Sequence, residues 1–276
     1  MCAANLSEGR DHAVLAALRA SAGDALCDTH VDVDHHRCVL TMASAAPGFP
    51  ARLLDLAQVA TDLIDLRAHR GVHPRLGALD VVPFAPLHGT SLDEAVAARD
   101  EVAAGLGLLG IPAFRYGPLA DGTTRSLPEL RRRAFVDLSP DAGPPEPHPT
   151  AGATAVGARL PLVAWNAWVQ GASLEETRRV AASVRTVHVR ALGLEVEGAT
   201  QVSCNLVDPV TEPPHVVFSR IEALLPEHAH VVRCELVGLV PDRVLDVVPR
   251  SWWERLDLSE ERSVEWAAAR IGVGTG

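Results

Sequence analysis

Histidines, arginines and carboxylates concentrate in two short segments of the N-terminal half. Residues 30–37 read His-Val-Asp-Val-Asp-His-His-Arg, and residues 65–80 hold two histidines and three arginines directly before the apolar run 81–84. A histidine, with an ordinary pKa of about 6.5, can act as a general acid or base. Arginines beside it can hold a carboxylate with two parallel hydrogen bonds. For the second segment, composition alone does not distinguish a reactive site from a loop held together by structural salt bridges.

The first segment has two further interpretations. If residues 28–34 form a strand, His30, Asp32 and Asp34 share one face and can line a cleft or a polar turn. Histidine and aspartate are also common metal ligands. Because no second cluster has the spacing of a zinc site, the polar cleft or turn is favoured and no metal is expected.

The C-terminal half has the clearest element pattern. Apolar or alternating runs predict strands over residues 161–168, 187–195, 200–206 and 231–236. Ser173 followed by Glu176 has the spacing of a capping box and predicts the start of a helix, and residues 213–225 predict a second one. The resulting order, βαββαβ, is that of a split βαβ or ferredoxin-like module.

The N-terminal half predicts a similar module. Helices are expected over residues 11–22 and 51–65, strands over 28–34, 37–43 and 79–84, and a further helix is capped by Ser91 and Glu94. The Gly/Pro-rich segment 139–152 is interpreted as the connection between domains. We therefore expect an α/β (α+β) fold of two ferredoxin-like βαββαβ-type subdomains, residues 1–157 and 158–276.

Composition and missing motifs exclude several functions. The chain has 25 basic against 35 acidic residues, so nucleic acid is not an expected partner, and Arg131–Arg133 is interpreted as a solvated helix end. No glycine-rich nucleotide loop follows a strand. No apolar run approaches the about 20 residues of a membrane span, and no signal peptide is recognisable. The five cysteines are scattered and are expected to be reduced. The expected location is the cytoplasm.

Several strings, in order and spread over nearly the whole chain, resemble one known family. They are residues 5–10 (NLSEGR), 34–37 (DHHR), 70–84 (RGVHPRLGALDVVPF), 152–159 (GATAVGAR), 201–206 (QVSCNL) and 235–241 (ELVGLVP). On these strings the chain resembles the glutamate formiminotransferase (formimidoyltransferase) family. That resemblance implies two α/β subdomains with facing sheets, helices on their outer faces, and a homodimer. It also implies transfer of a formimino group from N-formimino-L-glutamate to tetrahydrofolate, a co-substrate, in a channel between the sheets and without a metal.

The resemblance also implies roles for individual residues. The family's catalytic histidine corresponds to His73, which would take the proton from N5 of tetrahydrofolate as that nitrogen adds to the formimino carbon. A tetrahedral intermediate would then release glutamate. His30, Asp32, Asp34 and Arg37 would hold the amidinium and the carboxylates. The matching strings add two further candidates for binding substrate or folate, Arg75 and Asn205.

Some positions depart from the family pattern. Val72 and Pro118 stand where the family usually has glutamate, His36 where it has asparagine, and Ala142 where it has phenylalanine. Two alternatives account for these changes. One is divergence within the family, and the other is a changed donor or acceptor, such as another amidine as donor or an amine in place of folate. A non-catalytic folate-binding relative, a structural partner protein and a metal hydrolase are the remaining alternatives.

Overall fold

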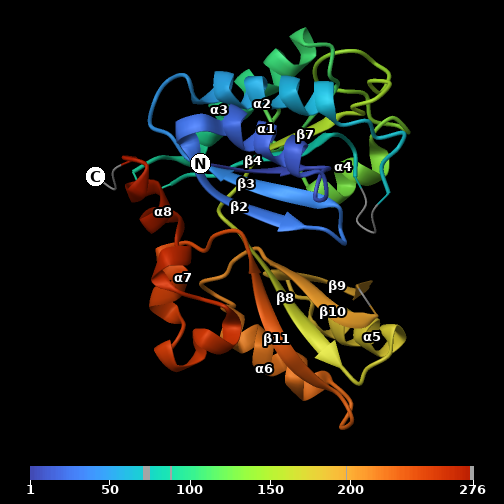
Figure 1. The fold of residues 1–276 in the computed structure, drawn as a ribbon, viewed down its shortest axis with the longest axis vertical. Coiled ribbons are helices and arrows are strands. Elements are labelled where there is room, and N and C mark those ends of the chain that lie inside the picture. The colour runs from blue at the N-terminus through green and yellow to red at the C-terminus, as the bar shows by residue number, and fades with distance from the viewer. Residues whose placement is uncertain (71–74, 88, 197, 274–276) are drawn as a thin grey trace. The chain divides into compact units, whose positions relative to one another are not determined.

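The computed structural model describes residues 1–70, 75–87, 89–196 and 198–273 (Figure 1). Contacts divide the chain into two units, and each is described by itself. The first unit comprises residues 1–160 together with the residues from Ala268 onward, and the second comprises residues 161–267. His73 lies outside the described residues.

The second unit contains a four-stranded antiparallel sheet. Its strands and helices follow the predicted order: β8 (Val163–Gln170), α5 (Leu174–Val184), β9 (Val189–Val196), β10 (Ala199–Leu206), α6 (Pro214–Leu224) and β11 (His230–Val237). The strand order in the sheet is β11-β8-β10-β9. The predicted capping box of Ser173 and Glu176 is confirmed. Four short elements follow: α7 (Asp242–Val247), η2 (Arg250–Trp252), η3 (Glu254–Leu256) and η4 (Glu260–Arg262). The last helix, α8 (Val264–Arg270), begins in this unit and ends among the residues assigned to the first.

The first unit contains a larger, mixed sheet. Its elements are β1 (Cys2–Leu6), α1 (His12–Ala22), η1 (Gly23–Ala25), β2 (Leu26–Asp32), β3 (Arg37–Met42), α2 (Phe49–Leu63), β4 (Leu79–Phe84), α3 (Leu92–Leu108), β5 (Ala113–Pro118), β6 (Thr124–Arg125), α4 (Leu127–Arg133) and β7 (Thr154–Ala158). The seven strands lie in the order β2-β3-β1-β4-β7-β5-β6. Among the described residues of this sheet, the pairs β4–β7 and β7–β5 are parallel and the other pairs are antiparallel.

Helices cover both faces of this sheet, unequally. Helices α1, α2 and α3 pack on one face, where they share an apolar core with alternate residues of the strands (Figure 1). The shorter α4 packs on the other face, over β5 and β7. Strand β7 is buried on both sides, as parallel strands inside a sheet usually are, with Val156 in the first core and Ala155 in the second. Across the described ranges, no helix is both long and apolar enough to cross a bilayer.

Three expectations about the first unit are wrong. Strand β2 ends at Asp32 rather than at residue 34. Strands β1, β5, β6 and β7 were not predicted, so the sheet is larger than a four-stranded module. Segment 139–152 does not connect the two units: it lies within the first one, where Asp141 and Ala142 donate backbone hydrogen bonds to Ala113, and it leads into β7 in the middle of the sheet. The structure thus has an α/β architecture with one seven-stranded and one four-stranded sheet.

Candidate functional site

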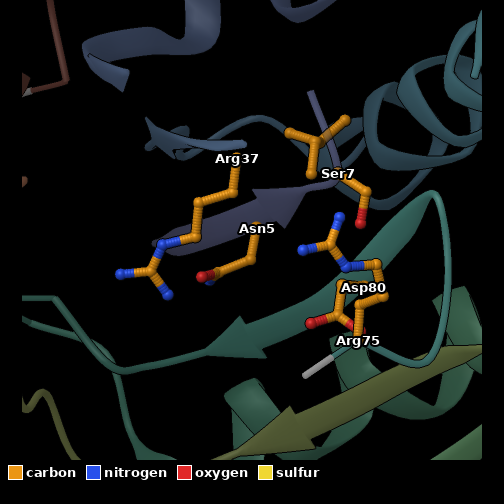
Figure 2. Close-up of a pocket in the computed structure, with 6 residues that line it drawn as sticks. Asn5, Ser7, Arg37, Arg75 and Asp80 are labelled. Carbon is orange, nitrogen blue, oxygen red and sulfur yellow. The ribbon is translucent and has the colours of Figure 1, made fainter. Parts of the chain in front are cut away.

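A polar pocket lies in the first unit, beside the ends of three neighbouring strands. It is lined by Asn5, Leu6, Ser7, Arg37, Arg75 and Asp80 (Figure 2). Asn5 belongs to β1 and Arg37 begins β3, and these strands pair so that Leu6 lies opposite Cys38. Arg75 and Asp80 come from the segment that enters β4. The pocket therefore joins two guanidinium groups to a carboxylate and two neutral polar side chains.

The turn between β2 and β3 fixes the position of Arg37. Asp32 and Arg37 are directly opposite in the register of the two strands. The Asp32 carboxylate accepts a hydrogen bond from the backbone N–H of His35 at 2.8 Å and contacts Nδ1 of the same residue. Burial by itself would raise the pKa of Asp32, but the two bonds from His35 and the charge of Arg37 lower the pKa to about 2. Asp32 is therefore ionised at neutral pH.

Glu8 connects this turn to the segment after β1 through hydrogen bonds. Its Oε1 accepts hydrogen bonds from the backbone N–H groups of Gly9, Arg10 and Asp11 at 2.8, 2.7 and 3.0 Å, and lies 3.1 Å from Nε2 of His36. Burial alone would raise the pKa of Glu8, but the backbone donors and His36 together lower it.

The neighbouring Gly9 is required by the close approach of the turn. A Cβ on this residue would fall on the carbonyl oxygen of Asp32 and lie 2.7 Å from the nitrogen of Arg37. The string that contains Glu8 and Gly9 thus packs its backbone directly against the turn that carries Arg37.

Two stacked histidines connect the turn to the segment before residue 71. His36 has a left-handed backbone (φ 50°), and its ring stacks on that of His69 with centroids 3.9 Å apart. Nδ1 of His36 lies 2.9 Å from the carbonyl oxygen of Arg70, so both of its nitrogens face oxygen acceptors. The guanidinium of Arg75 contacts the ring of His69. Burial first, and then the charges of Arg75 and His36, lower the pKa of His69 to about 4, so this ring is neutral at pH 7.

Asp80 organises the far side of the pocket. One carboxylate oxygen accepts hydrogen bonds from the backbone of Leu76 and Gly77, and the other forms an ion pair with Arg131 of α4. Ser7 donates to the carbonyl oxygen of Gly77 at 2.8 Å, which ties the same segment to β1.

Arg75, on the same segment, lies in a positive field. Its pKa is lowered, chiefly by burial; Asp80 opposes this effect, while the charges of Arg10, Arg37 and Arg131 add to it. Because a guanidinium stays protonated in proteins, this field favours an anionic group in the pocket.

The structure brings some of the predicted site residues together. Asp32, Arg37 and Arg75 surround the turn and the pocket described above. His30 lies in β2 opposite Val39, on the same face of the strand as Asp32. Asp34 does not share that face as a strand residue, because β2 ends at Asp32 and Asp34 lies in the turn.

Two of the predicted site residues, His73 and Asn205, are not among the described residues that surround this pocket. His73 lies outside the described residues, between Arg70 and Arg75 in the chain. Asn205 belongs to β10 of the second unit, where its side chain is exposed. Whether either one binds a substrate stays a prediction.

The prediction from sequence left out residues that hold the pocket in place. These are Ser7, Glu8, His69 and Asp80. The two carboxylates lie inside the strings 5–10 and 70–84, but nothing in their local sequence indicates that Glu8 meets His36, 28 positions away. Within the described ranges, no three His, Cys, Asp or Glu side chains gather in a way that could hold a metal ion.

Comparison with known proteins identifies the family of this chain. Residues 1–159 match the formiminotransferase domain, N-terminal subdomain, and residues 163–275 match the formiminotransferase domain. The chain is 33% identical over 267 residues to glutamate formimidoyltransferase of Streptococcus pyogenes serotype M1, an alignment that covers 88% of this chain and 89% of the relative. It is 30% identical over 305 residues to glutamate formimidoyltransferase of Thermoplasma acidophilum, with 97% of each chain covered.

Longer relatives match as well. The chain is 33% identical over 308 residues to formimidoyltransferase-cyclodeaminase of Gallus gallus, with 99% of this chain but only 56% of the relative covered. The chain thus spans about half the length of that protein. Because the two family descriptions together cover nearly all of the chain, it belongs to the formiminotransferase family.

Proposed function

We propose that this protein transfers the formimino group of N-formimino-L-glutamate to tetrahydrofolate. Family membership supports the reaction class. The observation that carries the proposal is that Arg37 and Arg75 line one pocket, in a positive field to which Arg10 and Arg131 also contribute. Formiminoglutamate carries two carboxylates, and the guanidinium group of arginine is well suited to bind a carboxylate with two parallel hydrogen bonds.

The charges near the pocket also suit the other end of the donor. The formimino group is amidine-like and positively charged when protonated. Asp32, with a pKa of about 2, remains an anion at neutral pH and can attract an amidinium. In this proposal, His30 and Asp34 assist Asp32, while Arg37 and Arg75 hold the carboxylates.

The transfer needs one base that later acts as an acid. N5 of tetrahydrofolate attacks the formimino carbon, a new N5–C bond forms, and His73 takes the proton that N5 loses. The tetrahedral intermediate then collapses: the bond from this carbon to the glutamate nitrogen breaks, and that nitrogen takes the proton from His73. Atoms and charge balance without a metal or an oxidant. Positioning of the two substrates supplies the remaining acceleration.

The direct test is an assay of the purified protein with formiminoglutamate and tetrahydrofolate. We expect release of glutamate together with formation of formiminotetrahydrofolate. His73→Ala should lower kcat by about 10²–10⁴-fold, while alanine at the exposed His12 serves as the matched control. Folate binding without turnover in the wild-type protein would contradict the named donor and favour another amidine donor or a non-catalytic folate-binding relative. Full activity of His73→Ala would contradict the proposed base.

A further inference from the structure

The second unit carries a buried polar cluster that the proposed reaction has not used. On β8, Val163, Trp165, Ala167 and Val169 alternate into the core under α5 and α6. Asn166 and Trp168 therefore project from the opposite face of the sheet. In the register of the sheet, Gln201 of β10 lies opposite Trp168, and Glu235 of β11 lies opposite Asn166. Three neighbouring strands thus contribute to one cluster.

Most polar groups in this cluster bind one another. Oε2 of Glu235 accepts a hydrogen bond from Nε1 of Trp168 at 3.1 Å and lies 3.3 Å from Nδ2 of Asn166. The guanidinium of Arg233 lies over the ring of Trp168, 4.1 Å from its centroid. The ring is therefore fixed at its edge by the carboxylate and on one face by the cation.

Gln201 is the exception. Its side chain belongs to a residue with 0% of its surface exposed, and neither Nε2 nor Oε1 has a hydrogen-bond partner among the described residues. Buried amides are almost always hydrogen-bonded, because leaving them without a partner costs free energy. An apolar residue of the same size would avoid that cost, so an amide at this position is best explained by a partner that the described residues do not supply.

The chemistry of the amide selects among the proposed substrates. A side-chain amide presents one acceptor and one donor side by side in a plane. The carboxylates of formiminoglutamate only accept, and a protonated formimino group only donates, so each satisfies half of the amide. The pterin ring of tetrahydrofolate has a lactam edge in which an N–H stands next to a carbonyl oxygen. That edge can satisfy both atoms of Gln201 with two parallel hydrogen bonds.

We propose that the amide of Gln201 binds the lactam edge of the pterin ring of the folate co-substrate. The proposal rests on the proposed function for the presence of folate, and adds the residue that recognises the ring. It assigns Gln201 a binding role separate from the arginines of the first unit, which recognise carboxylates.

Calorimetric titration of the full chain tests this role without turnover. The probes are 5-formyltetrahydrofolate, which has the pterin edge, and p-aminobenzoylglutamate, which lacks it. In Gln201→Leu we expect Kd for the first probe to rise about tenfold or more, with unchanged Kd for the second and unchanged KM for formiminoglutamate. The melting temperature should not fall, because the substitution removes a buried amide that lacks a partner. Gln170→Leu, at the exposed end of β8, is the matched control.

The outcomes separate this inference from the proposed function. Equal folate affinity in wild type and Gln201→Leu, together with a lower melting temperature in the variant, would overturn the binding role and indicate a structural amide. The proposed transfer would stand in that case. A wild-type protein that binds neither probe would overturn both proposals. If Gln201→Leu does not fold, Gln201→Met provides a second side chain of similar length without the amide, and the same comparison applies.

Discussion

Oε1 of Glu8 lies 3.1 Å from Nε2 of His36, which joins the segment after β1 to the turn between β2 and β3. The same oxygen accepts the backbone N–H groups of three successive residues. A single carboxylate thus holds both the start of α1 and the turn that carries Arg37. Because His36 in turn stacks on His69, Glu8 also influences the segment that leads to Arg75.

Glu8→Gln should therefore destabilise the protein. Glutamine keeps an acceptor oxygen but removes the negative charge that strengthens the hydrogen bonds, and a hydrogen bond to a charged group contributes about 1.5–3 kcal/mol. We expect the free energy of unfolding in urea to fall by about 1–3 kcal/mol. The exposed Glu146→Gln variant carries the same chemical change and should differ from wild type by less than about 0.5 kcal/mol. Equal loss in both variants would contradict the role of Glu8.

Asp32 should make stability depend on acid pH. Its folded pKa is about 2, below the ordinary 3.8, because the bonds from His35 and the charge of Arg37 outweigh the opposing effect of burial. The stabilisation is then fully present above about pH 4 and is lost as the pH falls toward about 2. Urea unfolding at several pH values should show this decline, and Asp32→Asn should make it shallower. Asp55→Asn, an exposed control, should leave the slope unchanged; a slope unaffected by Asp32→Asn would contradict the assignment.

The second unit is the part of the fold that the sequence predicts best. Its strands are long and alternating, and residues such as Val163 and Trp165 on β8 mark the buried face directly. Its helix α5 begins at a capping box, a signal that needs only Ser173 and Glu176. Each of these signals is local, so neighbouring residues are enough to locate the element.

The first unit is harder because its missing elements depend on distant partners. Strand β1 alternates Cys2, Ala4 and Leu6 toward the core, but two of these side chains are small and the run is short. Segment 139–152 has the glycines and prolines of a linker, yet such residues also suit a coil that crosses the end of a sheet. The same difference applies to the site. The pairing of Asp32 with Arg37 can be predicted, because a hairpin brings these two residues together. The ion pair of Asp80 with Arg131 cannot, because these residues are 51 positions apart in the sequence.

The ion pair of Asp80 with Arg131 can be tested by comparing Arg131 with its neighbour Arg132 in helix α4. Asp80 is buried and also accepts two backbone hydrogen bonds, so removal of its cationic partner leaves a buried charge less well compensated. Arg131→Gln should lower the free energy of unfolding by about 1.5–3 kcal/mol. Arg132→Gln, at the next position, changes an exposed side chain and should cost less than about 0.5 kcal/mol. Equal effects would show that the helix end, and not the ion pair, determines the loss.

Gly77 should be intolerant of any side chain. A Cβ at this position would fall on the carbonyl oxygen of Ala153 and lie 3.0 Å from that of Ala151, because the two backbones run against one another there. Gly77→Ala should destabilise the protein by about 3 kcal/mol, which is the upper end of the usual range for overpacked substitutions. The shift of the backbone should also displace Asp80 and Arg75, which lie on the same segment. Gly48→Ala, where a Cβ meets nothing within 4 Å, should cost under about 1 kcal/mol. Thermal unfolding and the KM for formiminoglutamate, measured on both variants, test this comparison.

The pH dependence of catalysis distinguishes His69 from His73, the two histidines that precede Arg75 in the sequence. Burial and the charges of Arg75 and His36 lower the pKa of His69 to about 4, so this ring is already deprotonated throughout the neutral range and is a weak base. A base with the ordinary histidine pKa of about 6.5 should instead make kcat/KM rise between about pH 5.5 and 7.5. We expect that rise in wild type and in His69→Gln, and its loss, with kcat/KM lowered about 10²–10⁴-fold, in His73→Gln. If the rise occurs near pH 4 in wild type and disappears in His69→Gln, His69 is the base and the assignment to His73 is wrong.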